Sequence, residues 1–343
     1  RSIWVTGVQT CALPISPATS APVATAKAVE IPLSESFDLE SKIVKRAYRI
    51  SIALPKFTMQ HPPDSKVAIL FMPDADYFFR MVVDSTRVIQ ELEGRVPPML
   101  VVGIGYTSGK TMTAGILRGA DLTPTVDLEF EEFTRRVAPA FGGDPADLQP
   151  AGEGSGVAEK FLRFINEELK PELERRYAER YTLDHDNEVY AGVSLGGLFG
   201  AYALSAAPES FDRYVIGSPS LWWNKEAMFE LEKRYAEGRK DINARVHFAV
   251  GALEQGPNEP PNGFRMVDNT RRFMDVLAAH KYPSLRMSMR VVPDESHGSV
   301  VAPIFCSGIR EVMEHTPPPR PRVPDPSPKP AQDAADKSRN DSE

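Results

Sequence analysis

The sequence predicts an α/β protein with a mostly parallel central sheet and helices on both of its faces. Short apolar runs alternate along the chain with longer stretches of helical periodicity, which is typical of parallel strands joined by helices. The 343 residues, 42% of them apolar, suffice for one large core, and no repeat or linker divides them. We therefore expect one domain over residues 37–315, between a flexible leader (1–36) and a disordered tail (316–343).

Each expected strand is a short apolar run rich in β-branched residues. The strands are expected at 48–54, 67–72, 99–104, 188–193, 214–216, 246–250 and 287–292. The expected helices, which alternate with them, cover 82–93, 157–181, 195–206, 225–237, 266–280 and 302–313. Residues 106–155 are predicted to be a long loop, either one wall of a functional site or a mobile surface insertion.

Both chain ends differ in composition from the rest. Residues 5–15, V-T-G-V-Q-T-C-A-L-P-I, resemble the translation of a sequencing-library adapter and are left out of fold reasoning. Residues 17–27 are rich in Ala, Thr, Ser and Pro, like the segment that follows many bacterial signal peptides. A periplasmic or secreted location is therefore favoured, with a cytoplasmic one as the alternative. Eight prolines between residues 317 and 330 predict the disordered tail.

Charge and motif content exclude several classes of function. The net charge is −7, with acidic and basic residues interspersed, which argues against nucleic acid or an anionic membrane surface as a partner. No apolar run approaches the roughly 20 residues that cross a bilayer. We expect no metal and no cofactor, because the chain has no phosphate-binding glycine loop and no Cys/His cluster with ligand spacing. If Cys11 belongs to the adapter-like start, Cys306 stands alone and no intramolecular disulfide forms.

Residues 189–200, V-Y-A-G-V-S-L-G-G-L-F-G, contain a candidate nucleophile. Gly-x-Ser-x-Gly between an apolar strand and a small-residue helix predicts a tight turn with Ser194 at its apex. Gly192 and Gly196 leave room for that turn. The Ser194 hydroxyl then points out of the sheet, and the backbone N–H of Leu195 is a candidate oxyanion donor. The alternative is a glycine-rich helix start with an ordinary serine.

A nucleophilic serine needs a base and an orienting acid. His297, in P-D-E-S-H-G-S-V between the last strand and the last helix, is the candidate base, while His247 is assigned to the sheet. The acid is expected between Ser194 and His297, after the penultimate strand. Glu254, in G-A-L-E-Q-G, fits that position and would fix the tautomer of His297; Asp268 is the alternative.

Three other segments are expected to complete the site. The segment F-M-P-D-A-D-Y-F is predicted to supply a second oxyanion donor, the backbone amide of Asp76 or Ala75. Trp222 and Trp223, in G-S-P-S-L-W-W-N, are predicted to give at least one indole to the substrate pocket, with packing on the nucleophile helix as the alternative for the other. Arg118, in the long loop, is a further candidate substrate contact.

Together these motifs resemble the putative-esterase branch of the α/β-hydrolase superfamily, which contains siderophore esterases of the IroE and Fes kind and related carboxylesterases. The resemblance covers about residues 48–313 and rests on G-V-S-L-G-G-L-F-G, F-D-R-Y-V-I-G-S-P-S-L-W-W, F-I-N-E-E-L-K-P and E-S-H-G-S-V. It implies an α/β-hydrolase fold and a serine esterase that cleaves small-molecule carboxylic esters, siderophore esters among them, through an acyl-enzyme on Ser194.

One position departs from the branch. Ala75 stands where the branch usually carries the glycine of Leu-Asp-Gly-Asp. If that position requires a positive φ, the alanine is strained by about 1 kcal/mol, and the second oxyanion amide is in question. Two other hypotheses therefore stay open, namely an acyltransferase on the same scaffold and a catalytically weak binding module.

Overall fold

The structure is a computed structural model that describes residues 29–108, 111–141, 148–255 and 264–313. The adapter-like start, most of the predicted leader, Cys11 and the proline-rich tail lie outside the described residues. From Leu33 onward the described residues form one compact unit. Its first strand begins at Ser34, so the fold starts inside the segment that was predicted as leader up to residue 36.

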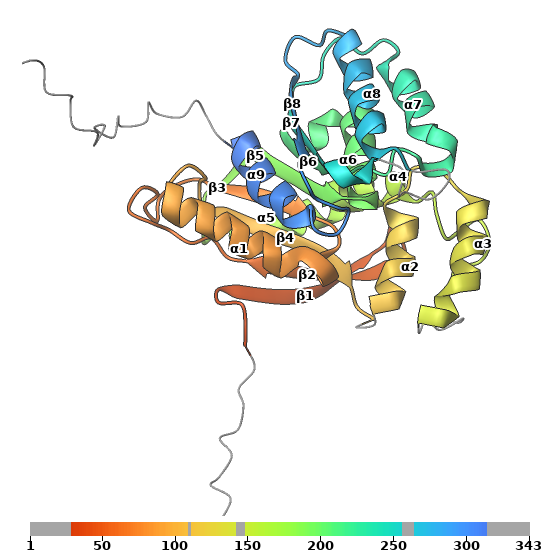
Figure 1. Cartoon of the computed structure of the whole chain (residues 1–343). Helices are drawn as coiled ribbons and strands as arrows, with labels where there is room; N and C mark the ends of the chain where they lie inside the picture. The colour runs from red at the N-terminus through yellow and green to blue at the C-terminus, as the bar shows by residue number, and fades with distance from the viewer. Residues whose placement is uncertain (1–28, 109–110, 142–147, 256–263, 314–343) are drawn as a thin grey trace, which may run out of the picture. The chain divides into compact units, whose positions relative to one another are not determined.

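One eight-stranded sheet in the order β1-β2-β4-β3-β5-β6-β7-β8 forms the centre of the described chain (Figure 1). The strands are β1 (Ser34–Ser41), β2 (Arg46–Ala53), β3 (Val67–Met72), β4 (Met99–Tyr106), β5 (Leu183–Val193), β6 (Arg213–Gly217), β7 (Arg245–Gly251) and β8 (Arg286–Val292). The β1–β2 and β2–β4 pairs are antiparallel, and every pair from β4 to β8 is parallel. The prediction of a mostly parallel sheet is confirmed.

Helices cover both faces of the sheet (Figure 1). They are α1 (Ala75–Glu93), α2 (Thr111–Asp121), α3 (Leu128–Val137), α4 (Ala158–Phe164), α5 (Lys170–Tyr177), α6 (Leu195–Ala206), α7 (Trp223–Ala236), α8 (Met266–Ala279) and α9 (Val301–Met313). α1 and α9 pack together on one face, and α4 to α8 lie on the other. No helix in the described ranges is long and apolar enough to span a bilayer.

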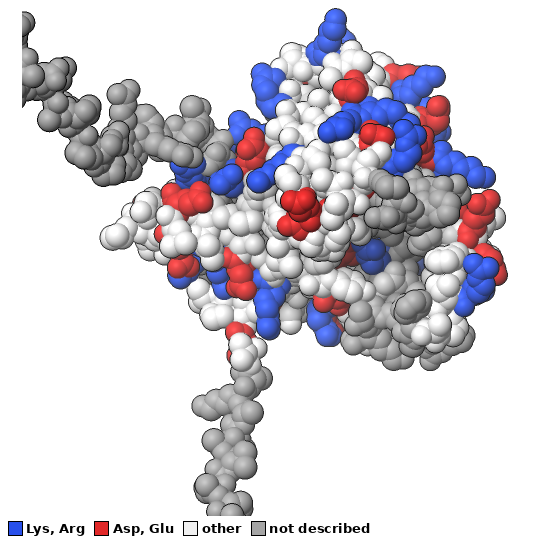
Figure 2. Space-filling model, viewed as in Figure 1, with Lys and Arg blue, Asp and Glu red and all other residues white. Residues whose placement is uncertain are grey.

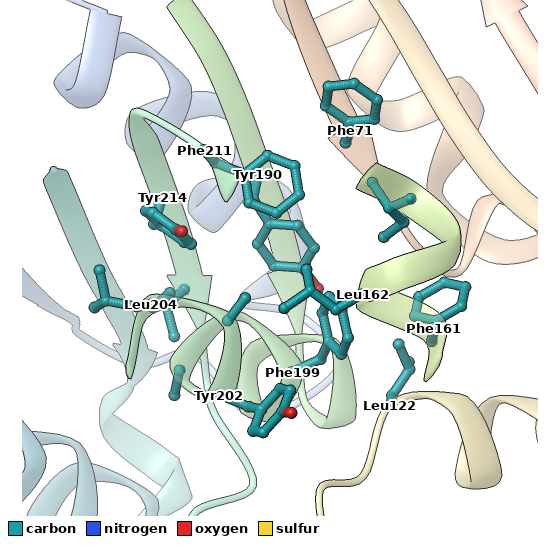
Figure 3. Packing of buried hydrophobic residues seen from close by; sticks show 14 of the residues in the cluster. Phe71, Leu122, Phe161, Leu162, Tyr190, Phe199, Tyr202, Leu204, Phe211 and Tyr214 are labelled. Carbon is teal, nitrogen blue, oxygen red and sulfur yellow. The ribbon is translucent and has the colours of Figure 1, made fainter. Parts of the chain in front are cut away.

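The largest apolar cluster lies between the sheet and α4 to α8, where aromatic rings from strands and helices interlock (Figure 3). Tyr190 on β5 packs against Phe199 on α6 and Phe211, with ring centroids 5.5 and 5.4 Å away. All three rings are buried, and burying such a side chain contributes about 1.5–3 kcal/mol. The Tyr190 hydroxyl donates to the carbonyl of Gly196 at 2.6 Å, so this core also fixes the start of α6.

The prediction of a long loop over residues 106–155 is wrong, because that stretch contains α2 and α3. α3 carried a signal in the sequence: Asp127 caps it by accepting from the Phe130 amide at 3.0 Å, and arginines close its last turn. α2 carried little signal, since T-M-T-A-G-I-L-R-G-A-D contains two glycines and two threonines, which are weak helix formers.

The end of α2 is anchored to the sheet by a buried polar cluster. The Asp121 carboxylate accepts from Arg46 Nη1 at 2.7 Å, from the Tyr48 hydroxyl at 2.9 Å and from the Tyr106 hydroxyl at 3.1 Å. Asp121 is fully buried. Removing one partner of such a pair typically costs about 3–5 kcal/mol, so this cluster holds α2 in place beside β2 and β4.

Several other elements differ from the prediction, among them β5, which begins five residues before the predicted start at 188. β1, S-E-S-F-D-L-E-S, was missed because it is an edge strand whose polar side chains are mostly exposed. α1 begins seven residues before the predicted start at 82. The helix predicted over 157–181 is divided by a π turn at Ile165–Leu169. On the face shown in Figure 2, acidic and basic side chains are interspersed, in line with the charge pattern of the sequence.

Candidate active site

Ser194 lies on the turn between β5 and α6, with φ 62° and ψ −119°. This backbone conformation is strained for any residue other than glycine, and it is typical of a nucleophile turn. The turn closes only over glycine, because a Cβ at Gly192 would lie 2.6 Å from the Gly196 carbonyl oxygen. The Ser194 amide donates to Gly217 O at 3.0 Å, and the Ser194 and Ser220 hydroxyl oxygens are 3.4 Å apart.

A cavity of about 340 Å³ opens at Ser194 and His297. Its other walls come from the first turn of α1, from α2 and from the start of α9: Tyr77, Phe78, Gly115, Arg118, Val193, Gly298 and Val301. A smaller cavity of about 100 Å³ shares Gly115 and Arg118 with it and is lined in addition by Leu195. The predicted nucleophile and base therefore face one pocket.

The turn between β8 and α9 carries His297, whose Nδ1 is hydrogen-bonded to Glu254 Oε1. Glu254 ends a short helix after β7, and only 2% of its side chain is exposed. Its other carboxylate oxygen accepts from the Ser218 hydroxyl and from the Gly251 amide, both at 2.6 Å. With Nδ1 held as a donor by the carboxylate, Nε2 of His297 is free to accept a proton. Within the described hydrogen bonds Ser194 pairs with Ser220, and such contacts often rearrange when substrate binds.

The alternative acid and the alternative histidine have other partners. Asp268 lies in the first turn of α8, where its carboxylate accepts from Gln255 Nε2 at 2.7 Å. His247 lies on β7 with Nδ1 2.8 Å from the Ser288 hydroxyl, and burial lowers the pKa of His247. His247 therefore stays neutral within the sheet, where the sequence placed it.

Ala75 has no positive φ, so the condition under which strain was expected there is not met. Asp74, not Ala75, adopts the left-handed conformation, with φ 59°, and aspartate tolerates it better than most residues. Ala75 is the first helical residue of α1. Its Cβ packs closely over Gly103 on β4, where a side chain is excluded because an added Cβ would lie 2.8 Å from the Ala75 Cβ.

Backbone amides at two helix starts are aimed out of their helices. In α1, the amides of Ala75 and Asp76 precede the first intrahelical bond, in which the Tyr77 amide engages Asp74 O. The Asp76 carboxylate is turned toward β4 and accepts from the Tyr106 amide at 3.0 Å; burial raises the pKa of Asp76 and this hydrogen bond opposes the rise. Asp76 is thus a candidate donor only through its amide, which also hydrogen-bonds the Asp76 carboxylate. Leu195 holds the equivalent position at the start of α6.

Arg118 reaches from α2 to Asp74 with two hydrogen bonds, Nε to Oδ1 at 2.7 Å and Nη2 to Oδ2 at 2.8 Å. Burial disfavours its charged form, but the adjacent Asp74 carboxylate outweighs burial and raises the pKa of Arg118. Arg118 therefore remains a cation in the wall shared by the two cavities. The sequence suggested it as a substrate contact and gave no sign of its partner.

Trp222 and Trp223 do not line either cavity as the structure describes them. Trp223 packs in the core: it is 1% exposed, and its indole N–H donates to Thr125 O at 3.0 Å. Trp222 stacks on Phe264 with ring centroids 4.3 Å apart, and a substrate contact for it stays a prediction.

Tyr77 and Phe78 supply the aromatic surface of the pocket, and the sequence analysis missed both. Their signal was present, since they are the last two residues of the segment F-M-P-D-A-D-Y-F that was predicted to supply an oxyanion donor. Among the described residues, no group of three or more His, Cys, Asp or Glu side chains is arranged to hold a metal ion.

A serine on the turn between a parallel strand and a helix, facing a histidine bonded to a carboxylate after the penultimate strand, defines an α/β-hydrolase. Within that class the chain belongs to the family described as "Putative esterase", whose model matches residues 139–286. It is 30% identical over 296 residues to the ferri-bacillibactin esterase BesA of Bacillus subtilis (strain 168), covering 83% of this chain and 91% of BesA.

Two further comparisons support this family assignment. The chain is 26% identical over 258 residues to a siderophore enterobactin esterase of Emericella nidulans, covering 70% of this chain and 80% of that protein. The crystal structure of the BES protein from Bacillus cereus superposes with a TM-score of 0.66 at 25% identity, covering 85% of this chain and 99% of that one. The protein is a carboxylic ester hydrolase of the α/β-hydrolase fold.

Proposed function

We propose that this protein hydrolyses the ester bonds of a siderophore through an acyl-enzyme on Ser194, with His297 as the general base and Glu254 as the acid that orients it. The observation that carries the mechanism is the arrangement of one pocket, in which Ser194 and His297 share the wall while buried Glu254 binds the far side of His297. The substrate class is supported by the relatives named for ferri-bacillibactin and enterobactin.

The first half-reaction forms the acyl-enzyme. Ser194 Oγ attacks the ester carbonyl carbon while His297 Nε2 takes the hydroxyl proton. The carbonyl oxygen becomes an oxyanion, which the amide of Leu195 and an amide at the start of α1, from Ala75 or Asp76, stabilise by hydrogen bonding. As the C–O bond breaks, His297 returns the proton to the leaving alkoxide, which departs as an alcohol.

The second half-reaction repeats these steps with water. His297 takes a proton from water, the resulting hydroxide attacks the acyl carbon, and the proton returns to Ser194 Oγ as the carboxylic acid leaves. In both halves His297 becomes transiently cationic next to the Glu254 carboxylate. An orienting carboxylate in this position can be worth about 10⁴ in turnover.

Replacement of Ser194 tests the mechanism. We expect Ser194→Ala to fold normally and to lose nearly all ester hydrolysis, since loss of the nucleophile leaves only residual electrostatic catalysis, about 10³-fold or more slower. An aryl phosphonate should label the wild type once, at Ser194 by mass spectrometry, and should not label the variant. Ser205→Ala, which removes a buried hydroxyl bonded to Ala201 O at 2.9 Å, is the control that should keep both activity and labelling. Labelling at another serine would refute the assignment.

The substrate class is tested separately. We expect kcat/KM for a catecholate trilactone siderophore to exceed that for p-nitrophenyl acetate and phenyl acetate after correction for leaving-group reactivity. A protein that cleaves the simple esters and leaves the trilactone intact would keep the serine mechanism and overturn the siderophore assignment.

A further inference from the structure

The turn Gly217–Ser220 that follows β6 joins the nucleophile to the acid. On one side, Gly217 O accepts from the Ser194 amide at 3.0 Å and the Ser220 amide donates to Ser194 O at 3.1 Å. On the other side, the Ser218 amide donates to Ala249 O on β7 at 2.7 Å. The serines of the motif G-S-P-S thus contact the proposed nucleophile and the segment that carries the proposed acid. From the sequence, only the tryptophans that follow this motif were predicted to take part in the site.

Ser218 makes the side-chain contact of this turn with Glu254. It is completely buried, and its hydroxyl donates to Glu254 Oε2 at 2.6 Å. Its φ is 36°, in the region that favours glycine, so a glycine would form this turn with less strain. The serine hydroxyl offsets that strain with a charge-assisted hydrogen bond to a buried carboxylate.

We propose that Ser218 is a positioning residue that acts through Glu254, an inference that rests on the proposed function. Glu254 Oε2 accepts from Ser218 and from the Gly251 amide, which leaves Oε1 for His297. Without the hydroxyl, the buried carboxylate keeps one donor on Oε2 and is free to turn, so that it holds His297 less firmly. Ser218 does not line the described cavities, so its loss should change turnover and not substrate binding.

The direct test is Ser218→Ala, with Ser205→Ala as the matched control. Both remove one hydroxyl from a buried serine, but Ser205 donates to a backbone carbonyl within α6. We expect Ser218→Ala to lower kcat at least about tenfold, the lower end of the range that corresponds to one lost hydrogen bond to a charged group, with KM changed less than about twofold. The pH at which kcat/KM reaches half its maximum should also move, which a loss of stability alone would not cause. Ser205→Ala should leave all three quantities unchanged.

A double mutant tests whether Ser218 acts through Glu254. In a Glu254→Gln background, Ser218→Ala should cause little further loss of kcat, because the carboxylate that it positions is gone. A second tenfold loss there would overturn the inference. If Glu254→Gln is impaired while Ser218→Ala equals wild type, the inference fails and the proposed function stands. If Glu254→Gln equals wild type, the proposed acid fails and the inference fails with it.

Ser218→Gly covers the case in which the alanine variant does not fold. Glycine accepts the φ of 36° without strain and likewise lacks the hydroxyl. We expect it to show the same loss of kcat and the same displaced pH profile. Wild-type turnover in a folded Ser218→Gly variant would overturn the proposal.

Discussion

The guanidinium of Arg118 on α2 donates two hydrogen bonds to Asp74, which lies between β3 and α1, from Nε to Oδ1 at 2.7 Å and from Nη2 to Oδ2 at 2.8 Å. The Asp74 side chain is 2% exposed and that of Arg118 is 19% exposed, so the carboxylate is shielded from water while the guanidinium still reaches the pocket. It connects the insertion that contains α2 and α3 to the turn whose amides are the proposed oxyanion donors. The wall of the pocket and the start of α1 are therefore held relative to each other.

Arg118→Lys should lower kcat about tenfold and leave KM within about threefold, because a single ammonium group cannot make the two-point contact that fixes Asp74. Steady-state kinetics on one ester measures both quantities. Arg163→Lys is the matched control, since Arg163 binds Glu167 with the same two-point geometry, at 2.9 and 3.1 Å, and both side chains are about half exposed. A large rise in KM with unchanged kcat would instead make Arg118 a substrate contact.

Glu254→Gln should lower kcat by at least about an order of magnitude with little change in Tm, because the amide keeps the shape of the side chain but cannot stabilise the imidazolium as a carboxylate does. Asp268→Asn should have a much smaller effect, since its carboxylate binds Gln255 and Arg265. Steady-state kinetics and thermal melts of both variants show which of the two carboxylates orients His297. A larger loss in Asp268→Asn, or none in Glu254→Gln, would contradict the assignment.

Gly197→Ala should destabilise the protein by about 1–3 kcal/mol and reduce turnover, because overpacking displaces backbone here. A Cβ at Gly197 would lie 2.9 Å from Pro219 Cα and closer still to Gly217 O, both in the turn that binds Ser194. Gly119→Ala on α2 is the control: its Cβ would meet Gly154 O at an ordinary 3.6 Å, and alanine favours a helix. Urea unfolding measures the stability of the two variants, and steady-state kinetics measures their activity. If Gly197→Ala is as stable and as active as Gly119→Ala, the turn can move to make room for the added Cβ.

Glu172 gives a pH-dependent contribution to stability. Hydrogen bonds from Arg175 and Arg176 lower the pKa of its carboxyl to about 2 from the unperturbed 4.5. A lowered folded-state pKa means that the stabilisation is complete above pH 4.5 and fades as the pH falls toward about 2. Each pair of this kind contributes about 0.3–0.5 kcal/mol.

The measurement is urea unfolding of wild type and Glu172→Gln at pH 7, 5 and 3 in low salt. The difference in unfolding free energy should be constant from pH 7 to 5 and smaller at pH 3. Glu179→Gln, a substitution of an exposed glutamate shortly after α5, serves as the control. A difference that grows on acidification would contradict the sign of the effect.

Sequence alone predicted the parts of this protein whose signal is local. The first and last residues predicted for β3 and for α6 are those of the structure. β3 is a continuous apolar run that ends at its polar flanks, and α6 begins directly after the nucleophile serine of Gly-x-Ser-x-Gly. The order of Ser194, Glu254 and His297 along the chain reflects the order of strand ends in a parallel sheet, so their shared location followed from topology.

What could not be predicted depends on contacts between distant segments. The partner of Arg118 lies 44 residues away, and that of Ser218 lies 36 away. The burial of Trp223 follows from its bond to Thr125, 98 residues earlier. No local pattern encodes such pairings, and side-chain direction at a turn like Ser218 depends on a φ that a serine rarely adopts.

The carboxyl ends of β5, β6 and β7 are level: Val193 pairs with Gly217, and Gly217 pairs with Ala249. The spacing of the nucleophile, of Ser218 and of the acid thus follows from ladder hydrogen bonds in the middle of the sheet, whereas Gly115 and Arg118 bring a part of the pocket wall from α2. The proposed catalytic residues and the part of the pocket wall in α2 therefore belong to different segments of the chain. We therefore expect substitutions in α2 that keep the Arg118–Asp74 pair to change substrate preference more than turnover.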